Sequence, residues 1–316
     1  MDLSKAGCVS SRQVRTGEVG QSSASALCFG QALAKMQKEQ IPEDSRQRQL
    51  PKSPVLRAIL NFAPSWFQVV MSTGIVSILL HIAPHRFPGM ATIGTVLYIA
   101  NVCLLLVFTM ITIARFVFFP WAFLQMFRHP AQSLFLGTIP MGLATVCNAT
   151  VLIAVPAYGQ WAINLAWVLW WIDVVLSVLS TCVMPTVMFE LQKHSIETMT
   201  RAWFLPIVPC VVAAALSGEV ASVLPRPHAL ITLIVGYVLW GIGVSMSFLI
   251  MGLYLHRMAS YHHLPNPEAM GSAFVPVGPC GQGAYGLILI AQAGQTVFSE
   301  SDFAGQADSG RLIMHE

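Results

Sequence analysis

The sequence predicts an all-α protein that crosses a membrane several times. The main observations are a scarcity of charged residues and a series of long apolar windows. Of the 316 residues, 55% are hydrophobic and only 10% are charged, with a mean hydropathy of +0.65. A soluble domain carries about 25% charged residues, because charged side chains cover a surface that faces water. Soluble enzymes and nucleic-acid-binding proteins are therefore excluded as descriptions of the whole chain, and the lipid bilayer is its first expected partner.

Seven windows are long and apolar enough to form membrane-spanning helices, which need about 20 residues each. Five windows contain no Asp, Glu, Lys or Arg, whereas the fourth contains Asp173 and the fifth contains Glu219. The windows are 62–82, 90–113, 131–155, 161–189, 202–224, 228–255 and 271–298.

The basic residues predict how these spans are oriented. Of the 17 Lys and Arg residues, all but Arg86, Arg226 and Arg311 fall on the side of the N-terminus. An excess of Lys and Arg marks the cytoplasmic side of a membrane protein. We therefore expect a flexible cytoplasmic tail over 1–57, a transmembrane domain over 58–298 and a polar C-terminal tail over 299–316.

Prolines divide the predicted spans into two alternating classes. The odd-numbered spans contain Pro64, Pro140, Pro206, Pro209, Pro276 and Pro279, whereas the even-numbered spans contain only Pro185. Proline removes a helix hydrogen bond, and irregular backbone inside a membrane is tolerated where it is buried or lines a cavity. The pattern predicts an inner ring of odd helices and an outer, lipid-facing ring of even helices, with helical hairpins as the repeating unit. The alternative is that these prolines only kink packed helices.

Two stretches resemble a known transporter family. The first runs from Phe62 to Phe67 and continues through Met71–Ile75, and the second is Pro276–Gly283, with the sequence PVGPCGQG. Together they resemble the tellurite-resistance/dicarboxylate transporter family, which includes fungal malate permeases, fungal sulfite efflux pumps and plant slow anion channels. The stretch Ile75–His81 is similar to the sulfite efflux pumps.

The resemblance implies ten transmembrane helices arranged as five hairpins, with the odd helices around a central pore. It implies sulfite efflux across the plasma membrane. The chain departs from the family at Ser72, where glycine is usual, and at Cys280, where a larger residue is expected. The gating phenylalanine of the family lies on the ninth helix, so no residue here inherits its role. Because seven predicted spans supply three hairpins and half of a fourth, we expect a truncated chain that does not transport alone.

An anion crossing these spans would meet neutral hydrogen-bond donors, because none of the windows contains Lys or Arg. The available donors are backbone N–H groups, helix N-terminal dipoles and Thr, Ser or Gln side chains. For each candidate, helix packing alone is the alternative. The residues predicted to line the path are Thr73, Gly74, Thr138, Pro140, Gly142, Pro209, Pro276, Gly278, Pro279, Gly281, Gln282 and Gly283. We also expect that the glycines and prolines of the seventh span prevent a straight packed helix there.

The two acids inside the spans lead to different expectations. A carboxylate in a membrane is costly and is a functional candidate. We expect Asp173, on an outer helix, to be structural and to form a hydrogen bond between helices. Glu219 lies on an inner helix, where desolvation favours the protonated form, which makes it a candidate for proton coupling. An interhelical hydrogen bond is the alternative for Glu219.

Three functions compete on these observations. An anion transporter with sulfite as substrate comes first, followed within the same family by a malate or dicarboxylate permease and an anion channel. The predicted cytoplasmic N-terminus argues against the second function, a seven-helix receptor. The third function, a membrane enzyme, is disfavoured because the spans lack an Asp/His/Glu cluster, a nucleophile elbow and an HExxH motif. We predict no metal, cofactor or nucleic acid, and assembly into a homo-oligomer stays open.

Overall fold

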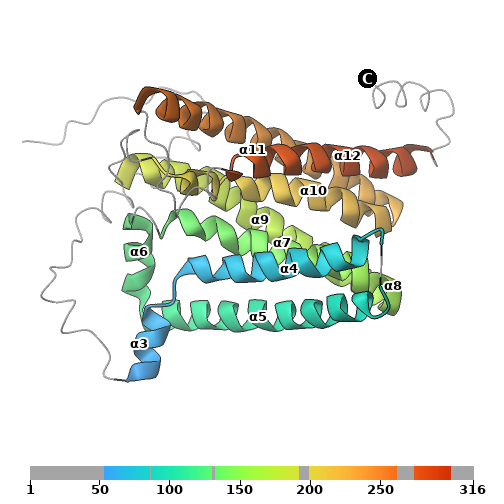
Figure 1. Ribbon diagram of the computed structural model, residues 1–316, viewed down its shortest axis with the longest axis horizontal. Coiled ribbons are helices and arrows are strands. Elements are labelled where there is room, and N and C mark those ends of the chain that lie inside the picture. The colour runs from blue at the N-terminus through green and yellow to red at the C-terminus, as the bar shows by residue number, and fades with distance from the viewer. Residues whose placement is uncertain (1–52, 86, 130–131, 192–198, 262–273, 300–316) are drawn as a thin grey trace, which may run out of the picture. The chain divides into compact units, whose positions relative to one another are not determined.

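The computed structural model describes residues 53–85, 87–129, 132–191, 199–261 and 274–299, whose secondary structure is entirely helical (Figure 1). These residues belong to one compact unit, Leu50–Glu316. Most of the predicted N-terminal tail and all but Ser299 of the predicted C-terminal tail lie outside the described residues. Helix α3 (Pro54–Leu60) begins inside the segment predicted as a tail.

Each of the seven predicted windows contains a helix. The helices are α4 (Phe67–Ile82), α5 (Met90–Phe118), α7 (Thr138–Ala149), α9 (Gln160–Leu191), α10 (Val208–Val223), α11 (Arg226–Tyr261) and α12 (Val277–Ser299). Five helical stretches are long and apolar enough to cross a membrane, namely Pro64–Ile82, Met90–Phe118, Leu134–Tyr158, Gln160–Glu190 and Arg226–Ser260. Helix α10 is apolar but has only 16 residues. The prediction of an all-α, multi-pass membrane protein is confirmed.

The helices α4, α7, α10 and α12 run parallel to one another, as their paired contacts show. Contacts between α10 and α12 advance in the same direction along both helices. The pairs are Val211–Gly283, Ala215–Gly286 and Gly218–Leu289. Contacts between the α4 segment and α7 do the same. These pairs are Pro64–Thr138, Val70–Gly142 and Gly74–Thr145.

The even-numbered spans return in the opposite direction and complete the hairpins. Along α4 and α5, for example, the contacts advance in opposite directions: Ser77 Oγ donates to the carbonyl of Gly94 at 2.8 Å, whereas Phe67 packs on Phe108. The short helix α6 (Pro120–Arg128) follows α5 and runs across the direction of the long helices (Figure 1).

Burial supports the inner and outer classes for part of the fold. In the stretch that contains α7, 61% of the most apolar window is buried, against 6% for α5. Helix α10 is also central, because eleven of its sixteen residues are buried. Helix α4 departs from the pattern, since only 28% of its window is buried, the same share as for α11. The reason is that one face of α4, including Ile75, Val76 and Leu79, is exposed.

The prolines of the inner helices lie at helix starts and not in the middle of the spans. Turns or 3-10 turns precede these helices, at Pro64–Trp66, Leu134–Gly137, Arg201–Phe204 and 274–276. Pro140, Pro209 and Pro279 then occupy the first turns of α7, α10 and α12. The first N–H groups of a helix have no partner within it, so proline fits there without loss of a hydrogen bond. The glycines and prolines of the seventh span do not interrupt its helix, because α12 is continuous from Val277. The start of α12 is nevertheless not closely packed, since Gly278 and Gly281 are exposed.

Candidate functional site

A cavity of about 440 Å³ lies between the C-terminal parts of the parallel helices. Its lining residues come from the first, third, fifth and seventh predicted spans, apart from Pro156 directly after the third. They are Ile82, Asn148, Val151, Leu152, Pro156, Gly218, Glu219, Ser222, Tyr285, Leu289, Gln292, Ala293 and Thr296. The helices that the proline pattern assigned to the inner ring are thus the ones that border this space.

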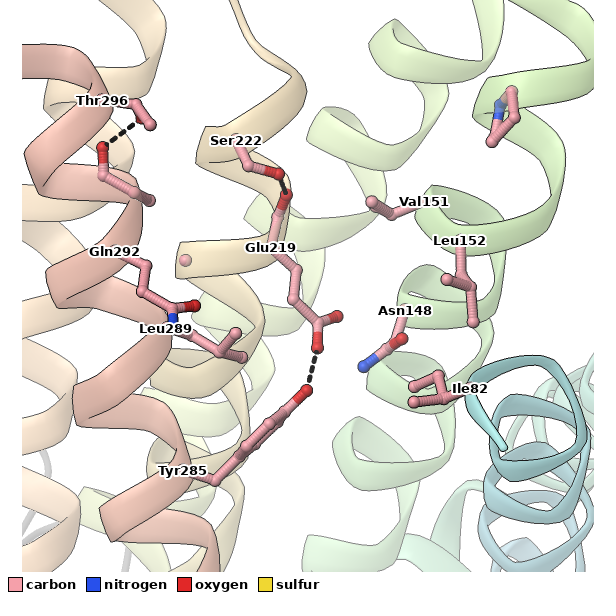
Figure 2. Close-up of a pocket in the computed structure, with 13 residues that line it drawn as sticks. Ile82, Asn148, Val151, Leu152, Glu219, Ser222, Tyr285, Leu289, Gln292 and Thr296 are labelled. Atoms are coloured by element: carbon pink, nitrogen blue, oxygen red, sulfur yellow. Dashed lines mark hydrogen bonds between the residues drawn. The ribbon is translucent and has the colours of Figure 1, made fainter. Parts of the chain in front are cut away.

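Glu219 of α10 is the acidic group of the cavity. The hydroxyl of Tyr285, on α12, donates a hydrogen bond of 2.9 Å to Glu219 Oε1. From α7, the amide of Asn148 points toward the same carboxyl group from the opposite wall (Figure 2). Ser222 Oγ donates to the backbone carbonyl of Glu219 at 2.6 Å. Three helices therefore converge on one carboxyl group.

Close packing of α10 on α12 brings Glu219 and Tyr285 within hydrogen-bonding distance. A Cβ added to Gly218 would lie 2.6 Å from the backbone carbon of Leu289. Gly218 must therefore remain without a side chain, as is common where membrane helices approach closely. The neighbouring residues Ala214, Ala215 and Ser217 are also small and buried. These small residues set the helix separation and thereby the geometry of the acidic site.

The wall opposite α10 contains an irregular turn. The end of α7 continues into the π-helix η3 (Thr150–Ala154), followed by α8 (Val155–Tyr158), and Val151 and Leu152 of η3 line the cavity. Thr150 Oγ1 lies 3.0 Å from the hydroxyl of Tyr98, which ties this turn to the outer helix α5. A π-turn inside an α-helix is rare and occurs frequently at functional sites.

The lining offers neutral donors and one acid. Of the thirteen residues that line the cavity, none is Lys, Arg or His. The polar side chains besides Glu219 are Asn148, Ser222, Tyr285, Gln292 and Thr296, all of which have an N–H or O–H group. The hydroxyls of Ser222 and Tyr285 donate to Glu219, and that of Thr296 donates to the carbonyl of Ala293. The amides of Asn148 and Gln292 are therefore the neutral side-chain donors that the lining has left for an oxyanion.

The residues predicted to line a path lie outside this cavity, and many are buried between helices. A Cβ on Gly74 would lie 2.5 Å from Thr145 Oγ1, and Thr138 Oγ1 donates to the carbonyls of Pro64 and Phe135 at 3.0 and 2.6 Å. The other buried members of the set are Pro140, Gly142, Pro209, Pro279 and Gly283. For these positions the structure shows the packing that was the alternative interpretation, and a place on the path stays a prediction.

The less buried candidates lie mainly at the start of α12. A Cβ added to Gly278 or Gly281 would meet nothing within 4 Å, whereas the carbonyl of Gly283 accepts a 2.8 Å hydrogen bond from Trp240 Nε1 of α11. Thr73, Pro276 and Gln282 are half-buried. Of all the predicted site residues, only Glu219 lines the cavity.

The structure also contradicts the expectation for Asp173. It is fully buried on α9, and neither of its carboxylate oxygens has a hydrogen-bond partner within the described part of the chain. The predicted interhelical hydrogen bond of Asp173 is therefore wrong. The hydroxyls of Ser180 and Thr181, two turns further along α9, donate to the carbonyl of Pro206 at 3.0 and 3.1 Å instead.

Sequence reasoning missed the other polar members of the cavity. Tyr285, Leu289, Gln292 and Thr296 recur at helical spacing on one face of α12, and that periodicity is a signal that the sequence contains. Asn148 has no comparable signal, because a single amide in an apolar segment does not reveal which helix it faces.

Comparisons with known proteins agree with this architecture. Residues 61–314 match the family described as voltage-dependent anion channel. A sulfite efflux pump of Arthroderma benhamiae is 45% identical over 247 residues, which are 78% of this chain and 66% of the pump. A sulfite efflux pump of Trichophyton rubrum matches with the same identity and coverage. A malic acid transport protein of Schizosaccharomyces pombe is 28% identical over 242 residues, 77% of this chain and 55% of that protein.

The chain spans about two thirds of the length of the sulfite efflux pumps that it matches. The family match covers more than half of the chain and includes every helix from α4 to α12. The sequence motifs, the helical membrane architecture and the family match agree, and the chain belongs to the voltage-dependent anion channel family.

Proposed function

We propose that this chain forms the path of a transporter that exports sulfite across the plasma membrane, with its N-terminus in the cytoplasm. The observation that carries the proposal is the cavity between four parallel helices, whose polar lining includes neutral amides and no Lys, Arg or His. The 45% identity to sulfite efflux pumps supports sulfite as the substrate. We further propose that α10 and α12 cross the membrane with the five longer helical stretches, as seven spans of a ten-helix pore formed from hairpins.

The common direction of the inner helices favours the entry of an anion at one end of the bundle. A helix carries a partial positive charge at its N-terminus, and α4, α7, α10 and α12 all begin at the same end of the bundle. The cavity lies toward the opposite end, where the helix dipoles are negative, so an anion there depends on the neutral side-chain donors of the lining. Because these donors are neutral, binding stays weak enough for the ion to leave, as conduction requires.

Within this proposal, the exposed start of α12 borders the path. Gly278 and Gly281 have open space beside them, and Gln282 and Thr73 are half-buried. The buried candidates act through packing that shapes the path. The transmembrane domain then corresponds to residues 58–298, between the two polar tails.

A chimera tests the proposed substrate. The matched region of the Arthroderma benhamiae pump is replaced by this chain's matching region and expressed in cells that lack their own sulfite exporter. We expect the chimera to restore growth on sulfite and to accelerate the efflux of labelled sulfite. A chimera that reaches the plasma membrane but carries no sulfite contradicts the proposal.

Malate is the second candidate, favoured by the likeness to the malic acid transport protein of Schizosaccharomyces pombe. A volume of about 440 Å³ lies within the range of small-molecule sites and leaves room for a four-carbon dicarboxylate. The same chimera decides between the two substrates. If malate is the substrate, labelled malate moves through it and excess sulfite does not compete.

A further inference from the structure

Two features make the cavity electrostatically negative. Glu219 is the acidic side chain among its thirteen lining residues, and none of these residues is Lys, Arg or His. The cavity also lies where α4, α7 and α10 end, since Ile82, Asn148 and Ser222 belong to the last turns of these helices. The C-terminal end of a helix carries a partial negative charge and attracts cations. A carboxyl group and three helix ends therefore favour a positive ion at the same place.

The contacts of Glu219 leave its charge without compensation. From α12 the hydroxyl of Tyr285 donates to it at 2.9 Å, and the amide of Asn148 faces it from α7, but both groups are neutral (Figure 2). Arg226, at the start of α11, donates instead to the carbonyl of Val297 near the end of α12. Hydrogen-bond donors favour an ionised carboxylate, whereas desolvation opposes it unless a counter-charge is present. An ionised Glu219 therefore requires a cation beside it.

Neutral oxygen atoms around the cavity are able to complete the ligand set of a small cation. The last carbonyls of a helix have no partner within it, and α10 ends at Val223, one turn after Glu219. On the opposite wall, the π-turn η3 would pair the carbonyl of Val151 with the next but four residue, Pro156, which has no N–H group. Gln292 adds an amide oxygen from α12. Unwound carbonyls and helix C-terminal ends are the groups that coordinate Na⁺ in membrane transporters.

The ligand set fits a monovalent metal cation. Ca²⁺ and Mg²⁺ usually require more carboxylate or phosphate oxygens than the single Glu219 supplies. Within the described residues, no group of three or more His, Cys, Asp or Glu side chains could hold a transition metal. The volume of about 440 Å³ also leaves room for an alkali cation that keeps part of its water shell.

We propose that the cavity binds a Na⁺ or K⁺ ion between the carboxyl group of Glu219 and the C-terminal ends of the inner helices. The cation compensates the carboxylate and the helix ends, which otherwise oppose an anion at this end of the bundle. The inference goes beyond the proposed function, because cation binding does not depend on which anion is carried. Na⁺ and K⁺ share the chemistry of this ligand set, and the experiment separates them.

Binding of labelled cations tests the site in the absence of a transported anion. The purified full chain in lipid nanodiscs is equilibrated with radioactive Na⁺ at about pH 8, where carboxyl groups ionise, with gluconate as the anion and N-methylglucamine to keep the ionic strength constant. A parallel experiment uses radioactive Rb⁺ in place of K⁺. We expect about one bound cation per chain, because the cavity contains a single carboxylate. Unlabelled Na⁺ or K⁺ should displace it, and the salt that does so at the lower concentration identifies the preferred ion.

Two variants locate the bound cation. Glu219→Gln keeps the shape of the side chain and removes its charge. We expect the affinity for the cation to fall at least about tenfold, since a unit charge at ion-pair distance contributes more than that in a protein. Asp173→Asn is the matched control, because Asp173 is the second acid of the spans and lies outside the cavity. It should bind the cation as the wild type does.

Two outcomes would overturn the inference. A wild-type chain that binds neither Na⁺ nor Rb⁺ does so whether or not Glu219→Gln folds, and it leaves a proton as the counter-charge of Glu219. Cation binding that persists in folded Glu219→Gln does so as well, because the ion is then bound elsewhere. Neither outcome contradicts the proposed function, which the chimera tests through sulfite flux.

Discussion

The two ends of the inner helices are built differently. At the N-terminal end, prolines lie in first turns and buried hydroxyls satisfy backbone carbonyls, as Thr138 does for Pro64 and Thr181 for Pro206. At the other end, Glu219 and Tyr285 meet side chain to side chain beside an open cavity. The first end is held by closed packing, and the second leaves space for a ligand. The comparison teaches that the proline-rich motifs position the helices, whereas dispersed polar residues form the site.

The largest expected effect comes from the contact that holds the cavity in shape. Gly218→Ala places a Cβ against the backbone of Leu289, so α10 and α12 must move apart. We expect the free energy of unfolding to fall by about 3 kcal/mol, at the upper end of the cost of overpacking. The measurement is denaturant unfolding in detergent micelles. Gly241→Ala is the control, because its Cβ meets nothing within 4 Å. Equal stability of the two variants would contradict the close packing of α10 on α12.

A smaller loss is expected at the N-terminal end. Thr138→Val removes the donor to the carbonyls of Pro64 and Phe135 in a buried position. We expect a loss of about 1.5 kcal/mol in the free energy of unfolding. Thr112→Val provides the comparison, since Thr112 bonds only to Phe108 of its own helix among the described contacts and should lose less. An equal loss of stability in the two variants would contradict the contribution of the bond from Thr138 to Pro64.

Flux through the chimera tests whether the start of α12 borders the path. Gly281→Leu adds a large side chain where the structure leaves open space, so the helix packing should tolerate it. We expect sulfite flux to fall about tenfold at unchanged surface expression, equivalent to about 1.4 kcal/mol. Gly252→Leu on α11 also meets open space and should not affect flux. Normal flux in both variants would remove Gly281 from the path.

The smallest effect separates the two acids of the spans. Asp173→Leu replaces a fully buried carboxyl whose oxygens lack described partners, and we expect a gain of about 1 kcal/mol in the free energy of unfolding. Glu219→Leu leaves the Tyr285 hydroxyl without its acceptor and should bring no such gain. Thermal unfolding of the two variants side by side measures the difference. Destabilisation by Asp173→Leu would show that Asp173 has a partner in the membrane.

The sequence by itself determined the membrane character and a helix in each of the seven windows. Its two alternating classes agree with the burial of α5, α7 and α10 but not with that of α4. These properties depend on local composition, because about 20 apolar residues in a row have few alternatives to a helix in a membrane. The same local information identified Glu219, since an acid in an apolar window stands out whatever surrounds it. The family resemblance also came from two contiguous stretches, and the comparisons confirmed it.

Only the tertiary structure decided what those residues do. Tyr285 meets Glu219 across 66 residues of sequence, whereas Asp173, which is also a single acid in an apolar window, finds no partner among the described residues. A proline interrupts a helix or begins one according to its position relative to the first turn. The positions of the prolines in the sequence do not reveal where that first turn lies. The physical reason is that helix formation is local, whereas the pairing of polar groups depends on which helices pack together and how closely the small residues let them approach.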